Sequence, residues 1–436
     1  MSALAYAVGV VLFVLGVGVS IGLHELGHLV PAKLFGARVP QYFIGFGKTL
    51  WSTKRGETEY GVKAIPLGGF VKIVGALPPG RGIGSRRPED LGFFARMIYE
   101  ARQAEYSLVR EGDEGRLFYR LAWWKKVVVM GSGVATNLVL GFVALAAMFM
   151  VHGVLTPTTT IRHVSDCVIA VTKANADLPP PKCTPHDKVA PAKLAGLRKG
   201  DKIVGFNGTP IHSWHQLTHL IRANRNGTAT IVVDRNGRRV TAHTNTTVSA
   251  RPKSAENPET IVRVGFLGVE PREVLVRHGF GYTARTIGDY TWTTVQAVGT
   301  LPQKMVGVAK AALGLQPRAQ NSPMSVIGAS RVAGQVSADR SVPLSSRLFF
   351  LVGLLGGLNL FLGMINLVPL PPMDGGQVAG ALFEAVRRGL ARVLRRPDPG
   401  YFDVAKLLPV AYVMAGVILV VSVVLVYADI VAPVQT

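Results

Sequence analysis

The chain has 436 residues, of which 48% are hydrophobic and only 17% are charged, against roughly 25% charged residues in ordinary soluble proteins. This deficit of charge argues against a soluble protein and predicts a membrane protein. The formal net charge is +22, but the basic residues are scattered, without a basic helix or interleaved aromatic and basic residues, so nucleic acid is not the expected partner. Attraction to anionic membrane lipids is the expected consequence of the charge.

Four apolar stretches are long enough to cross a bilayer, which takes about 20 residues. They lie within the segments 1–34, 127–151, 347–374 and 405–428. The first stretch lacks the basic start and the small-residue cleavage site of a signal peptide, so we expect it to be retained. The pattern predicts a polytopic α-helical membrane protein with four transmembrane helices.

The first apolar segment runs into the motif HELGH at residues 24–28. Two histidines four residues apart share one face of a helix, so both imidazoles can reach a single Zn²⁺ ion. Glu25 between them is placed to act as general base on a water molecule at that ion. Residues 3–23 carry no charge, and ionisable groups at membrane depth are costly and are usually kept there for function. The position of the motif therefore favours a catalytic site over a chance match.

Basic residues close to the spans predict their orientation. They precede the second span and separate the third span from the fourth: Arg120, Lys125, Lys126, Arg387, Arg388, Arg392, Arg395 and Arg396. Neither terminal tail contains Lys or Arg. Both basic loops should therefore be cytoplasmic, with both termini outside. The long segment between the second and third spans should be extracytoplasmic, because long loops translocate largely regardless of charge.

The predicted cytoplasmic stretch 35–126 has two parts. Residues 39–75 are rich in aromatic, β-branched and glycine positions and predict a membrane-associated β-hairpin. Its edge, at Gly69, Phe70 and Val71, offers a place where an extended substrate can pair by β-strand addition. The polar remainder, up to residue 120, predicts a surface insertion whose role the sequence leaves open.

The predicted exported stretch contains one module and one connector. Residues 191–208 (PAKLAGLRKGDKIVGFNG) resemble the bacterial PDZ signature, in which a helix turns into a strand and then into a tight Asn-Gly turn. A helical run at 213–223 and two strand-like runs follow it, so we expect one PDZ-like α+β domain over 158–270. Residues 271–346 predict a helical connector.

The chain has only two cysteines, Cys167 and Cys183, and both lie in the predicted exported stretch. An extracytoplasmic location is oxidising, which favours a disulfide between them over two free thiols. We therefore expect a small disulfide-closed loop in the PDZ-like domain.

Catalytic zinc usually takes three protein ligands and leaves one position open for water. Asp374 is the candidate third ligand beside His24 and His28. Under the predicted orientation, the first span reaches the cytoplasmic side near His28 and the third does so near Asp374, so both residues lie at similar depth. Apart from Glu25 and Asp374 itself, no acidic residue lies within the first three spans or at their cytoplasmic ends. An Asp followed by two glycines can also mark a simple turn, but the shared depth favours ligation.

Together these features resemble the site-2 protease family. The specific matches are HExxH in a first span, an exported PDZ-like domain and the pattern N-x-x-P-x-P-x-x-D-G-G from Asn366 to Gly376. Further matching pieces are Gly45-Phe46-Gly47, Thr58-Glu59-Tyr60, the run Ile65 to Lys72, and G-x-x-x-N from Gly133 to Asn137. The chain is most similar to the bacterial branch with the regulator-of-sigma-E protease, of actinobacterial type, and the likeness covers most of the chain except 76–120.

The resemblance implies one zinc ion on His24, His28 and Asp374, with Glu25 activating the water. It also implies that Asn366 helps to hold the substrate.

Three further residues are expected to support the site. Asn137 matches the family pattern in the second span. Pro369 and Pro371 break helical regularity just before the proposed third ligand. That break suits a site that must receive an unwound substrate, because the peptide groups of a transmembrane helix are hydrogen-bonded within it.

The resemblance further implies cleavage of single-span membrane proteins, such as anti-sigma factors and signal-peptide remnants, in the bacterial plasma membrane after an earlier extracytoplasmic cut. The best-known relative has two PDZ domains and this chain is expected to have one. A mechanism in which PDZ domains exclude large substrates would therefore differ between the two proteins. Two alternatives stay open. Another HExxH membrane metalloprotease would take a downstream Glu as third ligand, and a non-catalytic PDZ membrane adaptor would be expected to have lost Glu25 or a ligand.

Overall fold

The computed structural model describes residues 3–79, 91–171, 183–253, 260–319 and 322–434, apart from the side chains of Pro66 and Leu67. Contacts divide the chain into two units. Unit 1 comprises residues 1–151 and 279–436, and unit 2 comprises residues 152–278.

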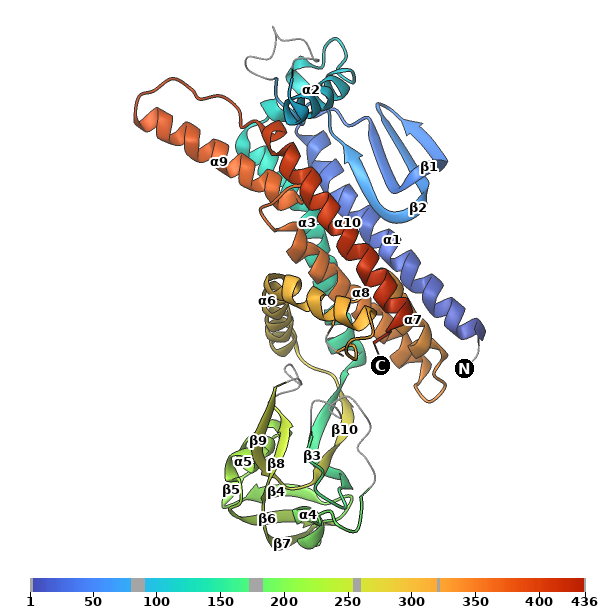
Figure 1. Cartoon of the computed structure of the whole chain (residues 1–436), viewed down its shortest axis with the longest axis vertical. Helices are drawn as coiled ribbons and strands as arrows, with labels where there is room; N and C mark the ends of the chain where they lie inside the picture. The colour runs from blue at the N-terminus through green and yellow to red at the C-terminus, as the bar shows by residue number, and fades with distance from the viewer. Residues whose placement is uncertain (1–2, 80–90, 172–182, 254–259, 320–321, 435–436) are drawn as a thin grey trace. The chain divides into compact units, whose positions relative to one another are not determined.

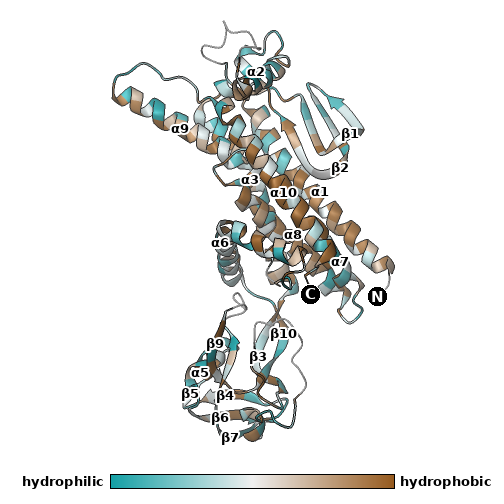
Figure 2. Ribbon diagram, in the orientation of Figure 1, coloured by the Kyte–Doolittle hydropathy of each residue, from teal (hydrophilic) through white to brown (hydrophobic). Residues whose placement is uncertain are grey.

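Unit 1 contains four helical stretches that are long and apolar enough to cross a membrane, as the sequence predicts. They are α1 (Ala3–Leu34), α3 (Trp123–Ala146, continued by a π-helical segment, Ala147–His152), α8 (Leu344–Asn366), and α10 (Leu408–Val431, preceded by the 3-10 turn η5, Val404–Leu407). Helices α1, α3 and α8 pack against one another (Figure 1), and Figure 2 shows that the residues of all four stretches are mostly hydrophobic. By helix length and composition, the structure confirms the expected helical membrane protein with four candidate spans.

The other described helices of unit 1 are shorter or less apolar. They are α2 (Phe93–Tyr106), α6 (Phe280–Ala312), α7 (Val326–Ala338) and α9 (Asp374–Val393), with the 3-10 turns η2 (Glu114–Arg116) and η3 (Phe118–Arg120).

Small and polar residues hold the apolar helices together. At Gly27 of α1 a Cβ atom would lie 2.6 Å from Thr136 Oγ1 and 3.0 Å from Gly133 Cα of α3, so the two helices approach closely only because no side chain intervenes. Ser132 of α3 donates a hydrogen bond to the Gly27 carbonyl at 2.7 Å. Asn359 of α8, only 3% exposed, donates to Ser20 Oγ of α1 at 2.9 Å. These contacts fix α1 against α3 and α8.

The stretch in which the sequence predicts a hairpin forms the antiparallel pair β1 (Gln41–Arg55) and β2 (Thr58–Lys72). Both strands bend, so that four segments lie side by side in the order 49–55, 58–63, 41–44 and 69–72. The glycines 45, 47 and 68 have φ of 92°, 84° and 109° at the bends, where a side chain would be strained. Segment 69–72 therefore ends this small sheet, and among the described strands it has a neighbour on one side only.

The third apolar segment differs from its prediction, which took it as one span ending at Asp374. The helix α8 ends at Asn366, and Asp374 instead begins α9. The prolines of residues 367–373 account for the break, because proline lacks the N–H and clashes with the preceding helical turn. At Gly375 and Gly376 a Cβ atom would overlap the backbone of this turn, so the two glycines let it fold against the start of α9.

Unit 2 is an α+β body built on antiparallel strand pairs. Its strands are β3 (Val154–Val164), β4 (Lys202–Phe206), β5 (Thr209–Pro210), β6 (Thr228–Arg235), β7 (Arg238–Asn245), β8 (Thr247–Pro252), β9 (Ile261–Phe266) and β10 (Val269–Val276), and its helices are α4 (Pro191–Leu194) and α5 (Trp214–Asn224). The larger sheet has the order β10-β3-β4-β6-β7, with β5 paired to β4, and β8 pairs with β9. The hydrophobic core of unit 2 includes Ile203, Phe206, Leu217 and Ile231.

Turn chemistry and one ion pair with a buried carboxylate shape unit 2. Asn236 and Gly237, with φ of 54° and 80°, connect β6 to β7 as the Asn-Gly pattern predicts. Burial alone would raise the pKa of the Asp201 carboxyl, but hydrogen bonds from the Arg235 guanidinium at 2.8 Å and from the Arg198 amide at 2.8 Å hold it below its usual value. The charged carboxylate thus links β6 to the start of β4.

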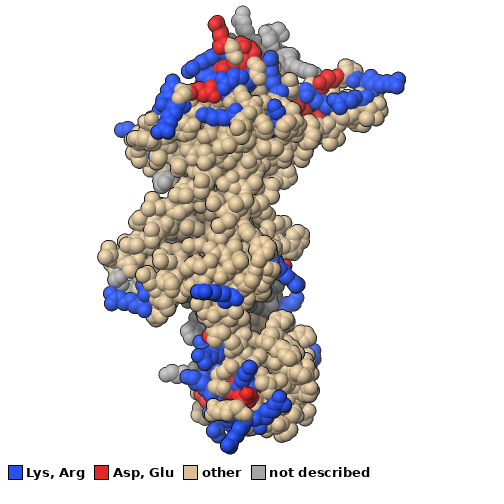
Figure 3. All heavy atoms as spheres, turned by 180° about the vertical axis from the view of Figure 1, so that it is seen from behind, with Lys and Arg blue, Asp and Glu red and all other residues tan. Residues whose placement is uncertain are grey.

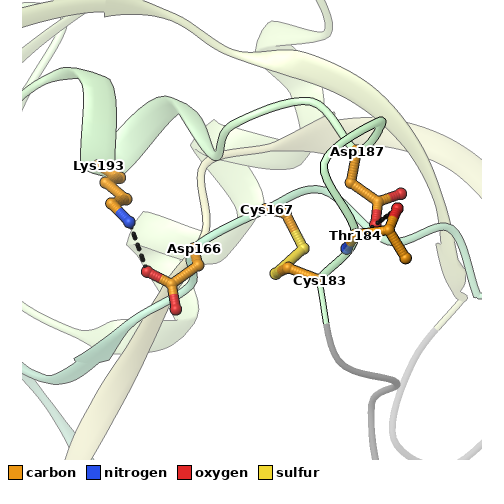
Figure 4. Close-up of a disulfide and its surroundings, with 6 residues drawn as sticks. All are labelled: Asp166, Cys167, Cys183, Thr184, Asp187 and Lys193. Atoms are coloured by element: carbon orange, nitrogen blue, oxygen red, sulfur yellow. Dashed lines mark hydrogen bonds and ion pairs between the residues drawn. A yellow bond between two sulfur atoms is a disulfide. The ribbon is translucent and has the colours of Figure 1, made fainter.

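The two cysteines are joined. Figure 4 shows the disulfide between Cys167 and Cys183, next to an exposed ion pair in which Lys193 donates to Asp166 at 2.7 Å. The disulfide that the sequence favours is therefore present in the structure.

Candidate metal centre

Three potential metal ligands converge where α1 meets the start of α9. His24 and His28 lie one turn apart on α1, and their Nε2 atoms are 3.2 Å apart. Asp374, the first residue of α9, places Oδ2 3.3 Å from each of these nitrogens. The three side chains are 13%, 7% and 20% exposed, so they lie largely out of solvent. The predicted ligands thus form one cluster, although 346 positions in the numbering separate His28 from Asp374.

The spacing of these atoms fits a tetrahedral zinc ion. Bonds of about 2.0–2.1 Å at the tetrahedral angle place neighbouring ligand atoms about 3.3 Å apart. His28 Nδ1 lies 2.8 Å from the Val129 carbonyl, which can only accept, so Nδ1 carries the proton and Nε2 presents its lone pair to the cluster. Asp374 Oδ2 is buried and accepts no well-aligned hydrogen bond from the described residues. His24, His28 and Asp374 therefore form a candidate cation site.

Two features of α3 hold the His28 imidazole in place. The carbonyl of Val129 fixes the ring orientation and the tautomer, as is usual for histidines that bind metals. Gly133 lies against the other side of the ring, and a Cβ atom at this position would overlap the imidazole. The sequence singles out Gly133 only as part of a family pattern; its contact with His28 explains why a glycine is needed.

The Gly133→Ala variant is therefore expected to lower zinc affinity about 10–100-fold, the loss typical of disturbing the groups that support a metal ligand. The added methyl group would displace the imidazole, which its Val129 hydrogen bond leaves little freedom to move. Zinc content after dialysis against graded chelator concentrations measures the effect.

Gly131→Ala is the matched control, because it makes the same change on the same helix at a position where a Cβ atom meets nothing within 4 Å. Equal zinc affinity in the two variants would show that Gly133 does not support the metal centre.

Glu25 lies between the cluster and the small sheet. It is half-buried on α1, and a Cβ atom at Gly69 would be 2.9 Å from Glu25 Cγ. The end segment 69–72 of the sheet thus passes directly over the glutamate. Phe70 stacks on Phe43, with ring centroids 5.6 Å apart, and so fixes this segment to the rest of the sheet.

The remaining predicted residues lie on the elements around the cluster. Asn137 is 2% exposed on α3 and packs against α8, where a Cβ atom at Gly363 would be 3.6 Å from its Cβ. Asn366 is the last residue of α8. Pro369 and Pro371 belong to the turn that leads into α9. Val71 packs at the margin of the apolar cluster around Leu29 and Val39.

A buried ion pair that the sequence does not predict anchors the helix carrying Asp374. Lys126, in the first turn of α3, donates to Glu384 of α9 at 2.9 Å, and the two residues are 6% and 1% exposed. Glu384 also accepts a hydrogen bond from the Phe402 amide at 3.0 Å. Because unpairing a buried charge is costly, this contact helps to hold α9, and hence Asp374, against α3.

Comparison with known proteins identifies the family of the chain. The model of peptidase family M50 matches residues 12–394. The chain is 33% identical to zinc metalloprotease Rip1 of Mycobacterium tuberculosis (strain H37Rv), with 99% of each chain covered, and 32% identical to zinc metalloprotease Rip1 of Mycolicibacterium smegmatis, with 98% of each covered. The chain therefore belongs to peptidase family M50, the site-2 protease family of membrane metalloproteases.

Proposed function

We propose that the protein is a zinc-dependent intramembrane endopeptidase that cleaves single-span membrane proteins. His24, His28 and Asp374 hold one zinc ion, and Glu25 is the catalytic base. The observation that carries this proposal is the convergence of three ligand atoms, 3.2–3.3 Å apart, beside a glutamate on a helix apolar enough to span a membrane.

The chemistry divides between the ion and the glutamate. Bound zinc supplies a Lewis acid, which favours ionisation of water and polarises the peptide carbonyl. The Glu25 carboxylate accepts the proton of the attacking water and then delivers it to the leaving amine. The burial of the ligand side chains limits access of bulk water, so this proton transfer takes place in a low-dielectric site.

Segment 69–72 of the small sheet is the proposed substrate-binding edge. A substrate helix must unwind before its peptide bond can react, and an extended chain needs new partners for its freed N–H and C=O groups. Gly69, Phe70 and Val71 have a strand neighbour on one side only among the described strands, and Gly69 lies next to Glu25. A substrate strand added at this edge would pass the catalytic glutamate. Asn366 at the end of α8 and Asn137 on α3 are proposed to support the substrate strand. Pro369 and Pro371 are proposed to keep the turn before Asp374 non-helical, so that no helix blocks the path of the substrate to the metal centre.

Unit 2 is proposed to be the PDZ-like domain and to gate the substrates, so that an earlier extracytoplasmic cut must come first. The charges near the spans support a plasma-membrane location with both termini and unit 2 outside and the metal centre near the cytoplasmic side. Anti-sigma factors and signal-peptide remnants are the proposed substrates, and anionic lipids the proposed surroundings.

The test uses the full-length protein reconstituted in vesicles with a single-span substrate, either intact or lacking its extracytoplasmic domain. We expect cleavage within the span of the truncated substrate, loss of cleavage with a zinc chelator and recovery on adding zinc. Mass spectrometry of the products locates the cut. Cleavage outside the span, or cleavage that resists complete zinc removal, would refute the proposal, and equal cleavage of both substrates would refute gating.

A further inference from the structure

A large cavity of unit 1 lies apart from the metal centre. It has a volume of about 980 Å³ and lies between α2, η3, the middle of α9 and residues 398–407 at the start of the fourth span. We call it the α2–α9 cavity. None of the metal-centre residues lines it, and the polar insertion, to which the sequence assigns no role, supplies one of its walls through α2.

The cavity carries an excess of positive charge. Its walls include five basic residues and two acidic ones, namely Arg102, Arg120, Arg387, Arg388, Lys406, Asp398 and Asp403. Arg102 donates to both oxygens of Asp403 at 2.7 Å, and Arg388 Nε lies 3.2 Å from Asp398. These two pairs account for both acidic residues. The charges of Arg120, Arg387 and Lys406 are therefore not balanced by a carboxylate of the wall.

Two buried guanidinium atoms lack an acceptor. Arg387 donates to the carbonyls of Gly400 and Tyr401, at 2.6 and 3.2 Å, but these acceptors are neutral. Its Nε atom is buried and has no hydrogen-bond partner among the residues that the structure describes. The same holds for Nε of Arg102, which is only 7% exposed. A buried donor without a partner is costly, and two of them in the wall of one cavity point to an anionic ligand.

The cavity lies at the end of the apolar helices, where a membrane surface is expected. Lys406 belongs to the first turn of the candidate span Val404–Val431. Arg120 shortly precedes α3, whose first residues Trp123 and Trp124 are 43% and 46% exposed. Exposed tryptophans at the end of a span are typical of the membrane–water interface. An anion bound here would therefore be at headgroup depth.

Helix α9 adds an apolar surface next to the same cavity. Phe383, Val386, Leu390 and Val393 follow a helical period and are 53%, 69%, 58% and 79% exposed. Five arginines lie on the same helix or just after it, and Lys and Arg are grouped at this end of unit 1 in Figure 3. An amphipathic helix with exposed apolar residues and arginines is typical of a helix that lies in the membrane interface. Phe383 also lines the cavity, so the apolar surface and the basic wall are continuous.

We propose that the α2–α9 cavity binds the phosphate headgroup of an anionic phospholipid. Guanidinium groups suit phosphate oxygens because they present planar, paired N–H donors. Arg120, Arg387 and Lys406 supply the unbalanced charge, and the exposed side chains of α9 lie along the acyl chains. A soluble phosphate compound would use the basic wall but would leave this apolar surface in water. The proposal requires only that the apolar helices span the membrane, and not the proposed protease chemistry.

The test compares lipid binding by two double variants of the full-length protein. Arg120→Gln with Lys406→Gln removes two charges from the cavity wall, and Arg392→Gln with Arg396→Gln removes two exposed charges from the last turn of α9 and the residues just after it. Each purified protein is titrated with short-chain phosphatidylglycerol or phosphatidylcholine, and native mass spectrometry counts the bound lipid. Unchanged elution in size-exclusion chromatography and an unchanged circular-dichroism spectrum show that each variant is folded.

We expect phosphatidylglycerol to bind the cavity variant about ten-fold more weakly than the wild type, because two charge-assisted contacts are lost, and to bind the control variant about as well as the wild type. Phosphatidylcholine should bind the wild type more weakly than phosphatidylglycerol. Equal losses in both variants would mean general attraction of charge, and no loss in the cavity variant would mean binding elsewhere; either result overturns the proposal. Displacement of the lipid by inorganic phosphate or glycerol phosphate would also overturn it, in favour of a soluble ligand.

Discussion

The Glu25→Gln variant is expected to cleave a truncated single-span substrate at least about 10³-fold more slowly than the wild type while binding zinc normally. The amide has nearly the size of the carboxylate, so it fits beneath Gly69, but it cannot accept the proton of the attacking water. The side chain is not one of the three clustered ligands, which is why the zinc content should not change. Initial rates in reconstituted vesicles and zinc per chain are the two measurements.

Glu100→Gln serves as the control for that variant. Glu100 is exposed on α2, where it accepts a hydrogen bond from Arg96 at 2.8 Å, so the same chemical change there should leave the rate near the wild-type value. Membranes of cells that contain only Glu25→Gln should also accumulate single-span fragments that the wild type removes. Undiminished cleavage by Glu25→Gln would mean that another group is the base.

The Asp374→Ala variant is expected to lose both zinc and activity. Alanine leaves two histidines on one helix, and three protein ligands are the usual number for catalytic zinc. The retained zinc should therefore fall from one ion per chain to near zero after dialysis, and cleavage should become undetectable. Removal of Asp374 also leaves the imidazoles of His24 and His28, with Nε2 atoms 3.2 Å apart, without the carboxylate that faces them.

Gln377→Ala is the matched control on the same helix, one turn after Asp374 and outside the clustered ligands. It should keep both zinc and activity, which separates loss of the ligand from disturbance of α9. If Asp374→Ala retained a full complement of zinc, the third ligand would have to be another residue and the proposed site would be wrong.

The cluster of ligands could be predicted because each step depends on local pattern or on depth in the membrane. The i, i+4 spacing places His24 and His28 on one face, and the charges near the spans place Asp374 at the same depth. The contacts that hold the His28 imidazole in place could not be predicted in this way. The Val129 carbonyl belongs to the backbone and carries no side-chain signal, and the contact of Gly133 with His28 depends on how closely α3 packs against α1.

Helix α9 is not predicted from the sequence. The arginines after the third apolar segment predict the side of the membrane on which the segment lies and not its secondary structure, and the residues up to Val393 form a helix with exposed apolar side chains on a helical period. The order of the four segments in the small sheet is equally non-local. It depends on the bends at Gly45, Gly47 and Gly68, and the alternation of residues along each strand does not reveal which segment ends at the sheet margin beside Glu25.

The distance in the chain between the two halves of the metal centre has a consequence for biogenesis. His24 and His28 enter the membrane with the first helix, whereas Asp374 follows the third long apolar helix and is synthesised when most of the chain is already made. On the proposed ligand set, a nascent chain therefore has two of its three ligands and no complete site. On this ligand set, the protease becomes competent only after unit 2 and α8 have been made, so the order of synthesis itself delays hydrolysis until the proposed gate, unit 2, is present.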